Sequence, residues 1–291
     1  MNKIVDLFGL DVAASSHVDW KRIVTDQHCP YVDKKCFKVR KSQPGISIGT
    51  CTTLYGKELF PIMICPSRLL ERQQIFVDCL HLLQGHIPGN ELHIISEVRV
   101  PGGSVDYFLV SALEGKVKDF VGIELQTLDT TGTVWPERQR LLMKLGIDVL
   151  EEDAISNKPF GMNWKMTAKT ILVQLHHKAQ TFENLNKRLV LVLQDRLLDY
   201  MKREFNFEHI GNARNSDPMH FHSYSLSKQV GGHRIMLAER HSTDTEGVAS
   251  SLGLKAEPNV GFAKIVAAIE KRISTSTVFK ISKKSKENDE I

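Results

Sequence analysis

The sequence predicts an α/β protein in which a mixed β-sheet is flanked by helices. Three observations lead to this prediction. Short runs of β type follow one another between residues 92 and 125, an uninterrupted apolar run covers 189–193, and apolar side chains recur at helical spacing over 166–182 and 195–205. An uninterrupted apolar strand is typical of a strand buried on both faces, and strands separated by helical segments indicate a sheet covered by helices.

The elements can be taken in order along the chain. From Cys29 to Cys65 the sequence is rich in glycine and proline and predicts turns. A helical pattern begins at Pro66 and ends near Gly85; strands are expected over 92–100, 105–110 and 117–125, and a last helix over 262–273. We therefore expect an N-terminal segment over 1–66, a main core over 67–275, and a polar, disordered tail over 276–291.

Composition narrows the functional classes. The chain has 291 residues, 42% of them apolar, which is enough to bury a substantial core. It contains no run of 18 apolar residues and no secretory signal, so we expect a cytoplasmic protein without membrane contact. The net charge of +4 permits a polyanionic partner without requiring one.

Four cysteines, Cys29, Cys36, Cys51 and Cys65, lie within 37 residues of one another. Disulfides are rare in the cytosol, so clustered cysteines are better interpreted as thiolate ligands. Four thiolates in a tetrahedral array suit zinc or iron, and the site would be structural because no coordination position stays open. The alternative is that the thiols are buried independently, as we expect for Cys79 on the following helix.

Basic residues surround Cys36 and suggest contacts with phosphate groups, although a solvated loop is the alternative interpretation. Further basic side chains stand beside aromatic residues later in the chain and could contact DNA bases or phosphates. The candidates for DNA binding are Lys35, Lys38, Arg40, Arg138, Lys165 and Lys169.

An acidic hairpin is the candidate catalytic site. A turn centred near residue 115 would set Asp106 almost opposite Glu124, with Cβ atoms about 5 Å apart, and Gln126 would project from the same face. Two opposed carboxylates cost stability unless a cation compensates them, and hard oxygen ligands suit Mg²⁺. Such an ion would lower the pKa of a bound water and stabilise the charge on a phosphodiester. Opposed acids also occur by chance, but these two interrupt otherwise apolar strands.

The residues Gly102 to Asp106 followed by Glu124-Leu125-Gln126 resemble the PD-(D/E)XK nuclease superfamily. The stretch from Gly122 to Arg138, with the preceding cysteines, is similar to one branch, the NotI and EagI type II restriction endonucleases. This resemblance covers Cys29 to about Val192. It implies a PD-(D/E)XK core preceded by a small four-cysteine metal-binding subdomain, with iron as its metal.

The resemblance further implies a Mg²⁺-dependent homodimer in the prokaryotic cytosol. Such an enzyme cuts double-stranded DNA at a GC-rich palindrome containing GGCC and leaves 5′ overhangs. Asp106 and Glu124 would hold the metal, Glu91 would be an additional acidic ligand, and Gln126 would stand where lysine is usual. Glutamine cannot supply positive charge, and no proline directly precedes Asp106, so the chain departs from the superfamily pattern at two points.

Two other interpretations stay open at this point. One is a non-enzymatic DNA-binding regulator with a four-cysteine metal centre. The other is a DNA repair or junction nuclease of the same fold. The interpretation as a regulator does not explain why an apolar hairpin carries two carboxylates.

Overall fold

The computed structural model describes residues 2–13 and 18–253, together with Val266, Glu270 and Lys271. The predicted tail over 276–291 lies outside the described residues, and these last three are all that is described of the helix predicted over 262–273. Residues 1–254 form one compact unit.

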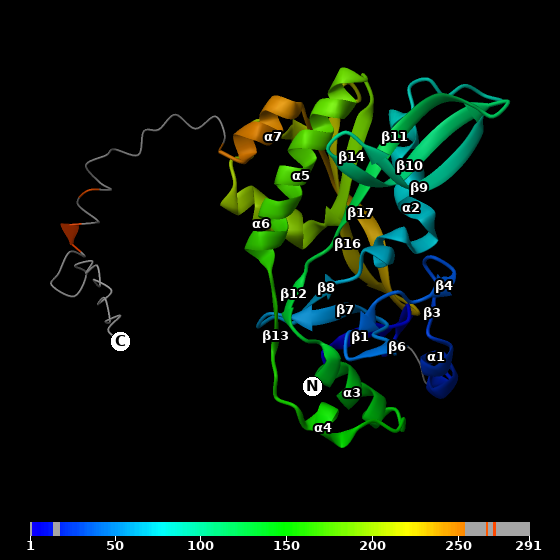
Figure 1. Ribbon diagram of the computed structural model, residues 1–291, viewed down its shortest axis with the longest axis vertical. Helices are drawn as coiled ribbons and strands as arrows, with labels where there is room; N and C mark the ends of the chain where they lie inside the picture. The colour runs from blue at the N-terminus through cyan, green and yellow to red at the C-terminus, as the bar shows by residue number, and fades with distance from the viewer. Residues whose placement is uncertain (1, 14–17, 254–265, 267–269, 272–291) are drawn as a thin grey trace, which may run out of the picture. The chain divides into compact units, whose positions relative to one another are not determined.

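A mixed seven-stranded sheet lies at the centre of this unit (Figure 1), which confirms the predicted α/β class with a mixed sheet flanked by helices. Its strand order is β15-β17-β16-β14-β11-β10-β9. The strands are β9 (Glu91–Val100), β10 (Gly103–Leu113), β11 (Lys116–Gln126), β14 (Arg188–Gln194), β15 (Gly211–Asn212), β16 (Met219–Gln229) and β17 (Gly232–Thr243).

The part of the sheet that carries the acidic residues follows the predicted order. Strands β9, β10 and β11 form an antiparallel meander. Helix α5 (Trp164–Asn184) then leads the chain to β14, which runs parallel to β11, and β16 extends the sheet in parallel beyond β14. The long β16–β17 hairpin was not predicted, because its polar and histidine-rich sequence lacks a clear apolar alternation.

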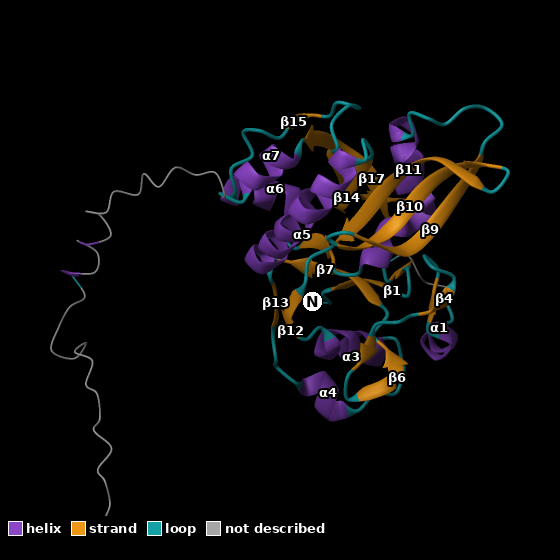
Figure 2. Ribbon diagram, turned by 45° about the horizontal axis from the view of Figure 1, so that its top comes forward, coloured by secondary structure: helices purple, strands orange, loops and turns teal. Residues whose placement is uncertain are grey.

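Two helical layers cover the sheet. Helices α5, α6 (Asp195–Glu204) and α7 (Thr245–Ser251) gather on one side (Figure 2), where their apolar residues form the larger core. Strand β14 is buried throughout, with Leu189, Leu191 and Leu193 facing this core. Its alternate residues Val190 and Val192 face a second core on the opposite side of the sheet. The predicted double burial of this strand is therefore confirmed.

The helix predicted from Pro66 to Gly85 is interrupted. It consists of a 3-10 helix η1 (Pro66–Gln73), a short α2 (Gln74–Cys79) and a second 3-10 turn η2 (Leu80–Leu82), because Arg72 and Gln73 adopt left-handed backbone angles. The predicted apolar face is nevertheless kept. Leu69, Phe76 and Cys79 are buried in the second core, which confirms Cys79 as a core residue.

The N-terminal segment is more ordered than its turn-rich sequence predicts. It forms a four-stranded sheet of order β2-β1-β7-β8, from β1 (Ile4–Leu7), β2 (Leu10–Asp11), β7 (Thr50–Tyr55) and β8 (Phe60–Met63). Short pairs β3 (His28–Cys29) with β4 (Lys34–Lys35), and β5 (Val39–Arg40) with β6 (Gln43–Ser47), lie between them. The remaining elements are α1 (Trp20–Asp26), α3 (Trp135–Lys144), α4 (Glu151–Ile155), β12 (Thr130–Gly132) and β13 (Phe160–Met162).

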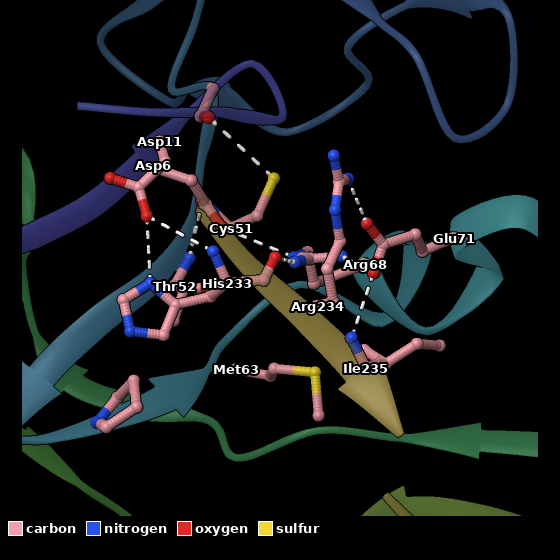
Figure 3. A network of polar contacts seen from close by, with 12 residues as sticks. Asp6, Asp11, Cys51, Thr52, Met63, Arg68, Glu71, His233, Arg234 and Ile235 are labelled. Atoms are coloured by element: carbon pink, nitrogen blue, oxygen red, sulfur yellow. Dashed lines mark hydrogen bonds and ion pairs between the residues drawn. The ribbon is translucent and has the colours of Figure 1, made fainter. Parts of the chain in front are cut away.

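A buried ionic network around Arg68 joins the N-terminal sheet to strand β17 (Figure 3). The Arg68 guanidinium lies 3.3 Å from the Asp6 carboxylate on β1 and 2.8 Å from that of Glu71. Glu71 also binds Arg234 of β17 at 2.6 Å and accepts a hydrogen bond from the Ile235 backbone. Buried carboxylates are stable only when paired in this way, so the network fixes how the two sheets meet.

In the described part of the chain, no helix combines the length and the apolar character needed to cross a lipid bilayer.

Candidate functional site

The hairpin of β10 and β11 has the register expected from the sequence. Tyr107 pairs with Ile123 and Phe108 with Gly122, so the next position sets Asp106 opposite Glu124. The strands are joined at Glu114 and Gly115, whose φ angles of 51° and 70° suit a tight hairpin turn. A register shift between Ser111 and Ala112 offsets the pairs beside the turn by one residue from those beyond it, and this offset is what sets Asp106 opposite Glu124.

Glu124 is the more deeply buried of the two acids, with 5% of its surface exposed. Its Oε1 accepts a hydrogen bond of 2.6 Å from Nζ of Lys178. Burial raises the pKa of Glu124 to about 7, against the opposing effect of Lys178, and the negative charge of Asp106 contributes to the rise. Glu124 therefore changes its charge near neutral pH and responds to any cation placed beside it.

Asp106 is half-buried, and its Oδ2 accepts a 2.8 Å hydrogen bond from the Leu125 backbone N–H. Burial raises the pKa of Asp106, while that hydrogen bond and the charge of Lys178 oppose the rise. The carboxylate of Glu97 on β9 also raises it. Asp106 thus lies within electrostatic reach of two other acids and one lysine.

Lys178 is the site residue that the sequence analysis missed. It is 6% exposed, and besides Glu124 it donates a 2.5 Å hydrogen bond to the Ser104 carbonyl. A signal was present: Lys178 falls on the apolar face of α5, three residues after Leu175 and four before Phe182. A lysine on a buried helical face requires a partner, and the nearest acids in an apolar strand were those of the hairpin.

Glycines allow α5 to lie close to the acidic hairpin. A Cβ atom on Gly122 would come within 2.4 Å of the Phe182 ring. Gly102 has a φ of +93°, and a Cβ there would lie 3.1–3.2 Å from the backbone and Cβ of His177. The glycines of the Gly102 to Asp106 motif and of β11 thus bring α5 near enough for Lys178 to reach Glu124.

Gln126 lies on the same strand as Glu124, two residues further on, and is half-buried. Its Nε2 donates a 2.6 Å hydrogen bond to the carbonyl of Thr127, so the amide is held in one orientation. The Oε1 atom is an acceptor that could orient a water molecule. The positive charge that glutamine lacks is provided nearby by Lys178.

Glu91 does not join this group. It pairs with Ala112 at the start of β9, whereas the residue of β9 opposite Asp106 is Glu97. Six residues of strand separate Glu91 from Glu97, a distance of roughly 20 Å. Glu91 binds His93 at 3.3 Å instead. The pairing register of β9 with β10, which the sequence does not specify, sets Glu97 rather than Glu91 opposite Asp106.

The four predicted cysteine ligands are all buried, with free thiols. Cys51 and Cys65 are hydrogen-bonded to each other, and Cys29 lies within electrostatic reach of Cys65 and Cys36. The pKa of Cys65 is lowered to about 6, first by Cys51 and then, against the effect of burial, by Lys38. The cysteines therefore converge on one region, as expected for ligands of one centre.

The four cysteines do not, however, form a complete set of metal ligands. Among the residues that the structure describes, no three His, Cys, Asp or Glu side chains are close enough to hold one metal ion. The same finding applies to the acids: Asp106 and Glu124 form a pair, and the nearby carboxylate of Glu97 affects Asp106 through its charge without completing a set of three ligands. A pair suffices for Mg²⁺, which usually retains several water ligands.

The basic candidates divide into two groups. Lys165 and Lys169 are exposed and available to a polyanion, whereas Lys35 is exposed but donates to the Gly45 carbonyl at 3.3 Å. Lys38 instead donates to the Ile64 carbonyl, and Arg40 forms a bidentate ion pair with Asp153 at 2.7 and 2.8 Å.

Arg138 is also unavailable to DNA. It is 2% exposed, and it donates to the carbonyls of Ile48 and Ser47 below the ring of Trp135. Internal acceptors therefore occupy donors of all three side chains, Arg138, Lys38 and Arg40, that were predicted to contact DNA. An arginine near a tryptophan gives the same local sequence pattern whether its side chain faces solvent or the core.

No protein-family model matches this chain, and no curated protein is significantly similar to it in sequence. The inference of function therefore starts from the site itself.

Proposed function

We propose that the protein is a Mg²⁺-dependent endonuclease that hydrolyses phosphodiester bonds of double-stranded DNA, of the type II restriction class. The observation that supports this best is the group formed by Asp106, Glu124 and Lys178. Two opposed carboxylates, one with its pKa near 7, meet a buried lysine on one face of a sheet. Carboxylates with a shifted pKa and a specific charged partner are typical of catalytic sites.

The donor chemistry fits Mg²⁺. Asp106 and Glu124 offer hard oxygen ligands on neighbouring strands, and the raised pKa of Glu124 reflects an incompletely compensated negative charge. A bound Mg²⁺ would supply Lewis-acid stabilisation of the charge that develops on the scissile phosphate. These two carboxylates would hold the ion, and no contribution from Glu91 is needed.

The chain's own residues complete the site. The ammonium of Lys178 keeps Glu124 in place and supplies positive charge where Gln126 cannot. Gln126 directs an acceptor oxygen for a water molecule, since its amide nitrogen is already engaged by Thr127. Exposed Lys165 and Lys169 on α5 would contact the phosphate backbone.

For the four cysteines we propose a structural iron or zinc centre held by Cys29, Cys36, Cys51 and Cys65. Its support is the convergence of four buried thiols, one of which ionises near pH 6. Thiolate is the form that binds metal, so the low pKa of Cys65 favours this role. The target that the resemblance implies, a GC-rich palindrome containing GGCC cut to leave 5′ overhangs, belongs to the same proposal.

Digestion of a plasmid of known sequence with Mg²⁺ tests the proposal. We expect discrete, reproducible fragments from the wild type, and none from Asp106→Ala, which should still bind DNA in a mobility-shift assay. Glu91→Ala is the matched control, because this acid lies at the far end of β9 and should leave cleavage intact.

The other outcomes separate the rival functions. A wild type that binds DNA without cutting it would support a non-enzymatic regulator. Cutting only at branched or damaged DNA would support a repair or junction nuclease. A chain that neither binds nor cuts DNA would rule out all three functions.

A further inference from the structure

A cavity of about 740 Å³ lies where the cysteine-containing N-terminal segment meets strand β9. Its walls come from the turn between β3 and β4, from η1 and α2, and from β9 and β10, which lie close together in Figure 1. Cavities of this size are typical of sites for small ligands. The proposed function makes no use of this one, since neither Asp106 nor Glu124 is part of its lining.

Four residues of the lining have left-handed backbone angles. They are Asp33, Arg72, Gln73 and Glu97, with φ between 52° and 55°. In the described part of the chain only nine non-glycine residues have a positive φ, so nearly half of them line this cavity. Such angles are unfavourable for residues with a Cβ atom and are concentrated at functional sites. The shape of the cavity is therefore maintained at a cost to stability.

The left-handed angle at Glu97 changes the direction of its side chain. In a regular strand Glu97 would share a face with Ile95. Instead it lines the cavity together with Ile94 and Ser96, whereas Ile95 and Val98 line an apolar groove on the opposite face. The distortion thus brings into the cavity a carboxylate that forms no ion pair with any described residue.

Two basic side chains of the lining have no partner in the described part of the protein. Lys34 and Arg72 are exposed, and neither forms a hydrogen bond or an ion pair with another described residue. Lys38, Arg40 and Arg138 differ from them, because internal acceptors occupy their donors. Unpaired lysine and arginine side chains bind anionic oxygens, and arginine does so with two parallel donors. An anionic group of a ligand can therefore pair with Lys34 and Arg72.

Aromatic rings form another part of the lining. Phe76 and Tyr107 meet edge to face with their centroids 5.6 Å apart, and Tyr107 and Tyr31 are partly exposed. Beside them, the side chains of Gln73 and Ser96 form no hydrogen bond with described residues. Exposed aromatic rings stack on nucleobases, and this contact accepts every base.

We propose that this cavity binds one nucleotide, with its phosphate on Lys34 and Arg72 and its base against Tyr107. A simple anion would leave the aromatic surface uncovered, and an apolar ligand would cover two cations without supplying a counter-charge. A nucleotide carries both an anionic group and a flat ring. The side chains of Gln73 and Glu97 then accept hydrogen bonds from amino groups of the base. The nucleotide is either free or the end of a nucleic-acid strand.

Isothermal titration of the full chain without added Mg²⁺ tests this proposal. We expect one saturable site for the deoxynucleoside monophosphates dAMP, dGMP, dCMP and dTMP. Deoxyguanosine, which lacks the phosphate, and deoxyribose 5-phosphate, which lacks the base, should bind at least about 10-fold more weakly, because each loses one of the two contacts. Deoxyribose 5-phosphate that binds as tightly as the nucleotides would reveal a site for anions only and would overturn the inference.

Arg72→Gly separates the site from the fold. Glycine adopts left-handed angles without cost, so the variant should unfold at the wild-type temperature or above it, yet bind nucleotides about 10-fold or more weakly. Arg72→Gln keeps the left-handed residue and removes the charge, and it should lose affinity to the same extent. Glu114→Gly, at a left-handed position in the β10–β11 turn, is the matched control and should bind like the wild type. Wild-type affinity in both Arg72 variants would refute the site.

A single-stranded tetranucleotide with a 5′ phosphate distinguishes the two sources of the nucleotide. Tighter binding of the tetranucleotide than of the mononucleotides, lost in Arg72→Gly, identifies a strand end, and equal binding identifies a free nucleotide. If no mononucleotide binds and the tetranucleotide binds regardless of Arg72, the inference fails. No cleavage is measured and the acidic pair lies outside the cavity, so this failure is distinguishable from a failure of the proposed nuclease activity.

Discussion

The Nζ atom of Lys178 lies 2.6 Å from Oε1 of Glu124 and joins helix α5 to strand β11 at the centre of the candidate site. The partnership crosses 54 residues of sequence. It brings a positive charge to a pair of acids whose strand neighbour, Gln126, carries none. The arrangement explains how a site with glutamine at this position can still balance two carboxylates.

Replacing Lys178 should impair cleavage more than binding. We expect Lys178→Met to lower the cleavage rate by about 10²-fold or more, since a charge placed at the reacting group contributes several kcal/mol. Plasmid cleavage under single-turnover conditions measures this, with a mobility-shift assay for binding. Lys144→Met, at an exposed position at the end of α3, is the control and should cut at nearly the wild-type rate. Comparable rates for the two variants would contradict the assignment.

The stability of the metal-free protein should depend on Glu124 between pH 4.5 and 7. The folded-state pKa, about 7, lies above the ordinary value of 4.5, so in this window the folded protein binds more protons than the unfolded chain. The contribution of Glu124 is therefore most favourable below about pH 4.5. It falls as the pH rises through 7, by on the order of 3 kcal/mol.

Urea denaturation in EDTA at about pH 5 and about pH 8 measures this effect, because the free energy of unfolding falls linearly with urea. The Glu124→Gln variant lacks the titrating group and should lose less stability over the interval than the wild type. Equal losses in both proteins would show that Glu124 titrates as an ordinary surface acid.

Gly122→Ala should disturb both folding and the site. The added methyl group would lie 2.4 Å from the Phe182 ring and 3.0 Å from Leu189, so we expect a loss of about 1–3 kcal/mol from overpacking. Thermal and urea unfolding measure it. Gly211→Ala, where no atom lies within 4 Å of the new Cβ, is the control and should change little. Partial rescue by Phe182→Leu would identify the clash as the cause.

Metal analysis of the purified protein should give about one iron or zinc per chain. Cys65→Ser should lose this metal, because it removes the thiol that ionises most readily. Cys79→Ser should keep it, since Cys79 is buried in a different core, near His222. Less than about half an equivalent in the wild type would contradict a four-cysteine centre.

Arg68→Ala should be strongly destabilising. It leaves the carboxylates of Asp6 and Glu71 buried with fewer partners, and breaking a buried ion pair costs about 3–5 kcal/mol. Arg203→Ala, at an exposed position on α6, should cost far less. Similar denaturation midpoints for the two variants would show that the network contributes little.

The sequence predicted the sheet best where local patterns were strong. Strands β9 to β11, β14 and helix α5 appear near their expected positions, because their apolar periodicity was clear. Hairpin spacing predicted Asp106 opposite Glu124, and the structure has this register because a bulge near the turn shifts the pairing by one residue. Contacts between residues far apart in the sequence were not predicted. Lys178 reaches Glu124 through tertiary packing, and Glu91 lies far from the pair because β9 pairs with β10 in a register that sets Glu91 opposite Ala112.

The basic residues illustrate the same limit. Charge density around Cys36 suggested a surface for DNA, yet Arg40 is bound by Asp153, 113 residues away in the sequence. Arg138 is held by carbonyls some 90 residues earlier. A cation's partner is set by the fold, so local composition cannot distinguish an internal ion pair from an exposed phosphate ligand. The interrupted helix after Pro66 was missed likewise, because its apolar spacing continues across the break.

The position of the N-terminal sheet has a consequence for how this protein can be shortened or recombined. Asp6 supplies one carboxylate of the Arg68 network, and Gln194 at the end of β14 bonds the backbone of Pro61 and Met63 with both atoms of its amide. Removing the first 63 residues would remove the ion-pair partner Asp6 of the buried Arg68 guanidinium and the hydrogen-bond partners of Gln194 at the end of β14. A shortened chain should therefore aggregate. Replacing this segment with one from another protein would succeed only if the new segment also supplied a carboxylate for Arg68.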